Sequence, residues 1–201
     1  MTATVPPPRP TDQRVPEARV ASMFTERWSR RAISPAPLPP ETVRTLLEAA
    51  RWAPSASNAQ PWLFVYGDDE ATLAALRPVL KDSNQRWANA APLLLFVFAR
   101  THNDKGEPAP TAQFDAGAAW MSLALQAHAL GLVAHGMAGF HHDKVYAATG
   151  VPEATYVAIA AIAIGYPGDE ALLPPDLQAR ELPSQRKPTR EFAFKGRFHA
   201  G

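Results

Sequence analysis

Two uninterrupted apolar segments, PLLLFVFA at residues 92–99 and VAIAAIAI at residues 157–164, most constrain how this chain can fold. Neither alternates between apolar and polar residues, as a strand with one solvated face would. The pattern predicts two central strands of a sheet that is covered on both faces. With 201 residues, 46% of them hydrophobic, the chain suits one domain with a buried core. We expect that domain over residues 17–201, after a proline-rich lead-in over residues 1–16.

The remaining pattern adds helices around these strands. Apolar spacing predicts helices over 17–27 and 41–52, and Pro54 should stop the second. A strand over 62–66, a helix from Asp69 that Pro78 ends or kinks, and an irregular loop over 81–92 follow. After a long apolar helix that Asp115 opens and Gly131 caps, we expect a short strand over 135–140 and a helix over 143–150. The basic, proline-rich tail over 168–201 should wrap around a folded body.

Charge and cysteine content exclude several classes of function. Lys and Arg number 20 against 19 acidic residues, so the formal net charge of +1 predicts neither a nucleic-acid nor a membrane partner. The basic tail is the feature that would favour nucleic acid, but it lacks regularly spaced aromatic residues for stacking. The absence of cysteine excludes disulfides and thiolate catalysis, and we expect a cytoplasmic protein. The apolar segment 116–134 carries Gln126 and His128 inside it, which argues against a membrane span.

The segment Arg27-Trp28-Ser29-Arg30-Arg31 is a candidate phosphate site. Guanidinium groups bind phosphate through two parallel hydrogen bonds and stay charged at any working pH, and a hydroxyl adds a further donor. The alternative is a solvated basic turn without a ligand.

The loop APSASNAQPW at residues 53–62 is a candidate contact for a planar ring. Its small side chains allow a ligand to approach the backbone, and Asn58 with Gln60 offers amide donors and acceptors to a heterocycle edge. The alternative is an ordinary helix-to-strand loop in which Ser and Asn cap backbone groups.

Four motifs together resemble the nitroreductase family of flavoenzymes: RWSRR, APSASNAQPW, LGLVAHGMAGF at 130–140 and IGYP at 164–167. The resemblance extends from Phe24 to about Arg190, and APSASNAQPW is its most specific part. It implies an α+β fold with a central, mainly antiparallel sheet flanked by helices. It also implies an interlocked homodimer that holds flavin mononucleotide (FMN) in each of two interface sites.

The resemblance also implies site residues. Four would hold the phosphate and ribityl chain: Arg27, Trp28, Ser29 and Arg31. Four would reach the flavin from the other subunit: Pro54, Ser55, Ala56 and Asn58. Three would lie over the isoalloxazine ring, where glycine permits close approach: Gly136, Ala138 and Gly139. Arg186 would contact the phosphate. Arg86 would contact the pyrimidine side of the ring, and Asn84 and Gln85 are alternative candidates for that contact.

The chain departs from the family pattern at three positions. Ile33 stands where an aromatic residue is frequent, and Ala138 stands where some members carry an acid, which predicts a less polar substrate pocket. Ser184 replaces a basic residue that commonly precedes the equivalent of Arg186. Lys187 is a candidate substitute for that lost phosphate contact.

The function expected from the resemblance is an FMN-dependent oxidoreductase. It would move hydride from NADH or NADPH through flavin N5 to nitroaromatics, quinones or similar small acceptors, with ping-pong kinetics and no catalytic side chain. No dinucleotide fingerprint is present, so the choice of NADH or NADPH stays open. A flavin-binding carrier or sensor without turnover is the alternative.

The histidines predict no metal site. His141-His142-Asp143 has no spaced partner, and Asp143 is suitably placed to be the N-cap of the following helix. His128, inside the apolar helix, is expected to be a satisfied core or interface residue.

Overall fold

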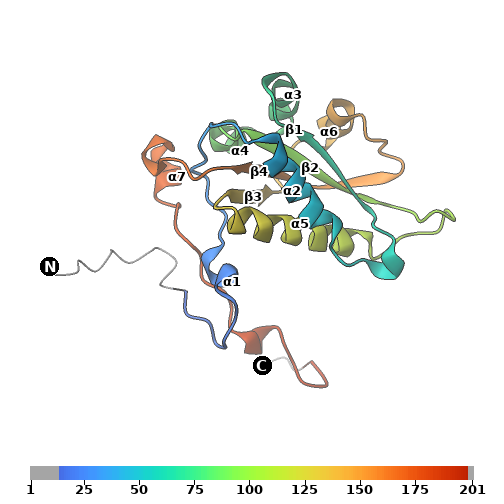
Figure 1. Cartoon of the computed structure of the whole chain (residues 1–201). Helices are drawn as coiled ribbons and strands as arrows, with labels where there is room; N and C mark the ends of the chain where they lie inside the picture. The colour runs from blue at the N-terminus through green and yellow to red at the C-terminus, as the bar shows by residue number, and fades with distance from the viewer. Residues whose placement is uncertain (1–13, 199–201) are drawn as a thin grey trace.

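A four-stranded antiparallel sheet forms the centre of the computed structural model, which describes residues 14–198 (Figure 1). The strands are β1 (Trp62–Gly67), β2 (Leu93–Arg100), β3 (Val133–Met137) and β4 (Tyr156–Gly165), in the order β1-β2-β4-β3. Every neighbouring pair is antiparallel. The two apolar segments are β2 and β4, the inner strands, as the sequence predicted.

Alternate side chains of β2 serve two separate cores. Leu94, Phe96 and Phe98 pack with α3 (Glu70–Leu76), α4 (Asp82–Ala88) and α6 (His142–Thr149) on one face. Leu93, Leu95, Val97 and Ala99 pack with α2 (Pro40–Arg51) and α5 (Ala112–Ala129) on the other. Because both faces are covered, neither inner strand needs the apolar-polar alternation of a half-exposed strand.

Local signals account for several helix ends. Asp69 and Thr72 form a reciprocal capping box at the start of α3, and Pro78 lies in the 3-10 turn Arg77–Val79 that follows it. Helix α5 ends in a Schellman motif: Gly131 has φ +72°, and Leu132 N donates to Ala127 O at 2.8 Å. The predicted positions of Pro78 and Gly131 are therefore confirmed.

The expected loop over residues 81–92 is wrong, because its first half is helix α4. Trp87 and Ala88 are buried at the end of α4 and join the core under β2. A seven-residue helix with two anchoring side chains at one end gives little periodic signal, so the sequence pattern missed it.

The expected helix over 17–27 is also too long. In place of it the structure has the short helix α1 (Ser22–Glu26), and Val20 and Phe24, which would lie on the buried face of the longer helix, are 50% and 54% exposed. At the other end of the fold, His141 rather than Asp143 is the N-cap of α6, and no side chain caps it. The third strand lies at Val133–Met137 rather than over 135–140.

Two arms leave the sheet together. In Figure 1 the segment that leads into α1 lies beside the chain after α7 (Pro175–Gln178), and both extend away from the body. We call residues 14–21 the N-terminal arm and residues 179–198 the C-terminal arm. The first 13 residues of the expected lead-in lie outside the described residues. No helix within residues 14–198 has the length and hydropathy to cross a membrane.

Candidate functional site

Two cavities that share Ser29 form the candidate site. The first, of about 260 Å³, is lined mostly by basic residues and serines: Arg14, Trp28, Ser29, Arg31, His135, Arg180, Leu182, Ser184 and Arg186. The second, of about 290 Å³, is mostly apolar: Arg27, Ser29, Trp120, Met121, Ala124, Gly136, Met137, Ala138 and Ala160. We call them the basic cavity and the apolar cavity. The tertiary structure thus brings the RWSRR segment next to Gly136, Ala138 and Arg186.

The end of β4 fixes the backbone after the RWSRR segment. Ser34 N donates to Tyr166 O, and Gly168 N donates to Ala32 O, both at 2.9 Å. A Cβ on Gly165 would lie 2.5 Å from Ile33 Cγ2, so glycine is required for this crossing. Ile33, a departure from the family pattern, therefore lies in the core and not in either cavity.

Arg27 has a guanidinium group that is partly buried and incompletely hydrogen-bonded. It caps the end of α1, and its Nη1 is buried without a hydrogen-bond partner among the described residues. Burial lowers the pKa of Arg27, and the nearby Arg186 guanidinium lowers it further. A buried cation beside a second cation is costly, and a bound oxyanion would relieve that cost. The residues present therefore fit a phosphate group.

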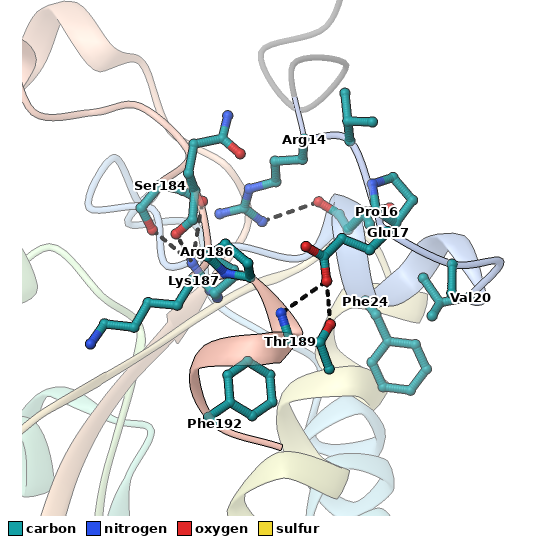
Figure 2. A pocket seen from close by; sticks show the side chains of 15 residues that line it. Arg14, Pro16, Glu17, Val20, Phe24, Ser184, Arg186, Lys187, Thr189 and Phe192 are labelled. Carbon is teal, nitrogen blue, oxygen red and sulfur yellow. Dashed lines mark hydrogen bonds between the residues drawn. The ribbon is translucent and has the colours of Figure 1, made fainter. Parts of the chain in front are cut away.

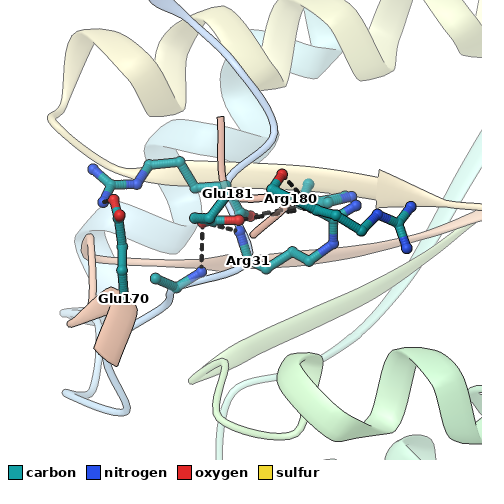
Figure 3. A network of polar contacts seen from close by, with 7 residues as sticks. Arg31, Glu170, Arg180 and Glu181 are labelled. Atoms are coloured by element: carbon teal, nitrogen blue, oxygen red, sulfur yellow. Dashed lines mark hydrogen bonds and ion pairs between the residues drawn. The ribbon is translucent and has the colours of Figure 1, made fainter. Parts of the chain in front are cut away.

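A buried carboxylate positions Arg31. Glu181 Oε1 accepts hydrogen bonds from the backbone N–H groups of Arg31, at 2.6 Å, and Ala32, at 2.9 Å (Figure 3). The Arg31 guanidinium lies 3.7 Å from Glu181 Oε2 and donates to the carbonyl of Arg180. Arg31 is thus fixed to the C-terminal arm while it lines the basic cavity.

His135 contributes a neutral ring to the basic cavity. Its Nδ1 donates to the carbonyl of Arg30 at 2.9 Å, and its ring lies 4.4 Å from that of Trp87. Burial is the largest effect on the pKa of His135 and lowers it, and the Arg31 and Arg27 charges lower it further. The hydrogen bond to the Arg30 carbonyl and the Glu181 carboxylate act in the opposite direction, but the net shift is downward. The histidine therefore favours its uncharged form.

Gly136 borders the apolar cavity from β3. A Cβ at this position would lie 3.1 Å from Trp120 Cζ2, so the missing side chain lets Trp120 of α5 pack against the strand. Ala138 also lines this cavity, whose other members include Met121 and Met137. A planar apolar ligand is the kind of group that such a lining accommodates.

Gly139 is close to these residues but lines neither cavity. A Cβ there would overlap the side-chain amide of Asn84, which donates to the Gly139 carbonyl at 2.9 Å. Gln85 and Arg86, the other two candidates in α4 for the contact with the pyrimidine side of the flavin, also have partners within the chain. Gln85 Nε2 donates to Leu80 O at 2.7 Å, and Arg86 pairs with Asp176 at 2.5 and 3.0 Å. In this chain α4 contributes to neither cavity.

The loop of residues 54–58 lies outside both cavities, at the C-terminal end of α2 (Figure 1). Its Ala56 N donates to Asp115 Oδ2 on α5 at 3.2 Å. Ser57, Asn58 and Gln60 all have positive φ, between 47° and 57°. Non-glycine residues adopt this conformation rarely, and clusters of such residues occur at functional sites. Pro54, Ala56 and Asn58 are exposed, so the loop is accessible to a second molecule.

The C-terminal arm places Arg186 in the basic cavity. Ser184, where the family pattern has a basic residue, accepts a hydrogen bond from Arg186 Nη1 through its Oγ at 2.9 Å. Lys187 lines a neighbouring cavity between the two arms instead. The sequence interpretation missed four lining residues: Arg14, Trp120, His135 and Arg180. His135 lies inside the motif 130–140 and Trp120 in the predicted apolar helix, whereas nothing local distinguished Arg14.

Other predicted features lie away from these cavities. His128 is partly buried, with Nε2 3.7 Å from Glu26 Oε2. The His142 ring lies 4.3 Å from that of Phe140. Over residues 14–198, no group of three or more His, Cys, Asp or Glu side chains is arranged to hold a metal ion.

Comparison with known proteins gives a family match. The model of the nitroreductase family matches residues 24–86 and 79–166. An NADH dehydrogenase of Thermus thermophilus is 32% identical over 189 residues, covering 77% of this chain and 88% of that protein. A 5,6-dimethylbenzimidazole synthase of Rhodospirillum rubrum is 30% identical over 178 residues, covering 76% and 84%.

Solved structures agree with the family match. An oxidoreductase containing FMN superposes with a TM-score of 0.89 at 44% identity, covering 94% of this chain and 97% of that one. A nitroreductase-like protein of Exiguobacterium sibiricum in complex with FMN superposes with a TM-score of 0.72 at 22% identity, which supports the shared fold alone.

Proposed function

Since this chain belongs to the nitroreductase family, we propose that it is an FMN-dependent oxidoreductase that reduces small electron-poor acceptors with NADH or NADPH. The FMN-containing structure at 44% identity supports the cofactor, and the NADH dehydrogenase relative supports the donor. The α+β fold with its antiparallel sheet between helices is the fold of the family.

The observation that carries the proposal is the meeting of the two cavities at Ser29. One cavity presents guanidinium groups and the other an apolar face, as a molecule with a phosphate at one end and a flat ring at the other requires. Arg27, with a buried and unpartnered Nη1, would bind the phosphate or ribityl end. Trp28, Ser29, Arg31 and Arg186 would complete that part of the site.

The apolar cavity would receive the isoalloxazine ring. Gly136 and Ala138 would allow the ring close to the backbone, and Trp120 would hold β3 at the required position. When bound, FMN supplies a two-electron carrier that accepts hydride from a nicotinamide and passes it to an acceptor. The protein's own residues bind and orient the ring and shape the space in front of it, so no side-chain nucleophile is required.

A homodimer would complete each site. Within one chain, Pro54, Ser55, Ala56 and Asn58 lie away from both cavities and, apart from the half-buried Ser55, are exposed. We propose that this loop reaches the flavin of the partner subunit. Exposed apolar side chains support association: Phe114 and Met121 on α5, and Leu182, Phe192 and Phe198 on the C-terminal arm.

The acceptor would be a small activated molecule such as a nitroaromatic or a quinone. No acidic residue lines the apolar cavity, because alanine occupies position 138. The relatives at about 30% identity include both an NADH dehydrogenase and a 5,6-dimethylbenzimidazole synthase, so family membership leaves the acceptor open.

The first test is the colour of the purified protein. We expect a yellow preparation with the absorbance of oxidised flavin, and mass analysis of the released cofactor should identify FMN. Steady-state oxidation of NADH or NADPH with a quinone should then give parallel double-reciprocal lines, the sign of ping-pong kinetics. Bound FMN without turnover on any such acceptor would instead favour a carrier or sensor, and a folded protein that takes up no FMN would overturn the proposal.

A mixed dimer tests whether each site uses two chains. One chain would carry Arg27→Ala with Arg31→Ala, and the other Ala56→Trp, with different affinity tags for isolation. If the loop serves the partner's cavities, one of the two sites in the mixed dimer is intact, and the dimer binds half the FMN of the wild type while both parental homodimers bind none. A loop that served its own chain would leave both sites of the mixed dimer defective.

A further inference from the structure

Arg14 connects the N-terminal arm to the candidate phosphate site. It lies eight residues before α1, lines the basic cavity, and also lines a cavity of about 380 Å³ between the two arms (Figure 2). This position lies outside the segment matched by the family model, which begins at residue 24.

Two backbone carbonyls hold the Arg14 guanidinium in place. Its Nη1 donates to Thr25 O at 3.1 Å and to Arg27 O at 3.0 Å, at the end of α1. Its Nε is buried and has no hydrogen-bond partner among the described residues. Nε and Nη2 form the edge with which arginine binds an oxyanion through two parallel hydrogen bonds. The bonded nitrogen therefore orients the group, while an edge suited to an anion remains.

The two charged groups that shift the pKa of Arg14 are both positive. Burial lowers the pKa of Arg14, and the Arg186 and Arg27 guanidinium groups lower it further. The residues that line the basic cavity include no Asp or Glu. Arg14 and Arg186 in this lining and Arg27 in the adjoining apolar cavity therefore repel one another, which favours the binding of a dianion beside them.

A contact between the arms keeps Arg14 near Arg186. The Glu17 carboxylate accepts hydrogen bonds from the Thr189 N–H, at 2.9 Å, and from the Thr189 hydroxyl (Figure 2). Glu17 follows Arg14 by three residues, and Thr189 follows Arg186 by three. The pairing therefore holds together the two arms whose arginines both line the basic cavity.

We propose that Arg14 is a fourth guanidinium for the FMN phosphate, beside Arg27, Arg31 and Arg186, and that the N-terminal arm supplies it. This inference rests on the proposed function. It gives the arm a binding role, in which Arg14 would supply a positive charge next to Ser184.

The test compares FMN with riboflavin, which has the same ring and ribityl chain but no phosphate. Flavin-free protein would be titrated with each ligand, and quenching of flavin fluorescence would give the Kd. Arg14→Ala should raise the Kd for FMN roughly 10- to 100-fold, because a charge-assisted contact is lost. The Kd for riboflavin should stay within about twofold of wild type. Arg14→Lys keeps the charge without the two parallel hydrogen bonds, so its Kd for FMN should lie between those of the wild type and Arg14→Ala.

Arg19→Ala is the matched control, because Arg19 lies on the same arm, is exposed and lines neither cavity. It should leave both Kd values unchanged. In a second readout, inorganic phosphate should raise the Tm of flavin-free wild type and of Arg19→Ala more than that of Arg14→Ala.

The outcomes separate this inference from the proposed function. An Arg14→Ala protein that binds FMN as the wild type does, or that loses FMN and riboflavin affinity equally, would show that Arg14 only braces α1. A wild type that binds neither flavin would overturn the proposed function itself.

Discussion

Glu181 and Arg31 are joined twice, through the backbone and through the side chain. The buried carboxylate accepts the Arg31 N–H at 2.6 Å, and its second oxygen lies 3.7 Å from the Arg31 guanidinium (Figure 3). The two residues are 150 positions apart, so this contact fixes the C-terminal arm to the start of the domain. It also couples stability to the candidate phosphate site, because Arg31 lines the basic cavity.

Glu181→Ala should therefore destabilise the fold and weaken FMN binding together. The substitution leaves the backbone N–H groups of Arg31 and Ala32 without an acceptor, which costs roughly 2–3 kcal/mol. Urea denaturation would measure this loss. Glu170→Ala removes a partly exposed partner of Arg30 and should change stability by less than about 1 kcal/mol. Equal effects of the two substitutions would contradict the role of Glu181.

Arg27→Ala combined with Arg31→Ala should yield a colourless protein. Arg27 lines the apolar cavity and Arg31 the basic cavity, and Arg27 has a buried Nη1 without a hydrogen-bond partner among the described residues. The absorbance of the purified protein and its FMN Kd are the measurements. Arg44→Ala with Arg51→Ala removes the same charge from the exposed side of α2 and should leave the flavin content unchanged. Stoichiometric flavin in the first double variant would refute the phosphate assignment.

Stability should fall on mild acidification because of His135. Burial lowers its pKa in the folded state, so the unfolded chain binds more protons as the pH drops below the ordinary histidine pKa, about 6.5. This contribution is fully present above that pH and is lost as the pH falls toward the lowered value. His135→Asn keeps a donor for the Arg30 carbonyl and removes the titration.

As the pH is lowered from 8 to 5.5, the Tm of the wild type should consequently fall relative to the Tm of His135→Asn. His102→Asn, at an exposed position, serves as the control for a general histidine effect. A Tm difference that stays constant with pH would show that His135 has the same protonation behaviour in both states.

Gly139 and Asn84 should show coupled energetics. Gly139→Ala places a methyl group against the Asn84 amide and should cost about 1–3 kcal/mol. Asn84→Ala removes the hydrogen bond to the Gly139 carbonyl and should cost about 1 kcal/mol. The double variant should lose less than the sum, because the shortened side chain makes room for the methyl group. Strict additivity in denaturation experiments would mean that the two residues do not share this space.

The sequence determined the elements whose cause is local or whose apolar pattern is continuous. Segments 92–99 and 157–164 are too apolar for any position but the centre of a covered sheet, and Asp69, Pro78 and Gly131 act on the backbone beside them. The motif resemblance identified the family, and RWSRR, Gly136 and Arg186 do border shared cavities. These features depend on residue type and spacing, which a sequence displays directly.

The tertiary structure decided what depends on distant neighbours. Helix α4 forms where Trp87 and Ala88 meet the core, and α1 stays short where Val20 and Phe24 remain about half exposed within the described part of the chain. Arg14 lines the basic cavity together with the distant Arg186, and the Glu17–Thr189 contact joins the two arms that carry them across 172 positions. Burial and the sum of neighbouring charges come from packing, and packing is fixed by the whole fold rather than by any one segment.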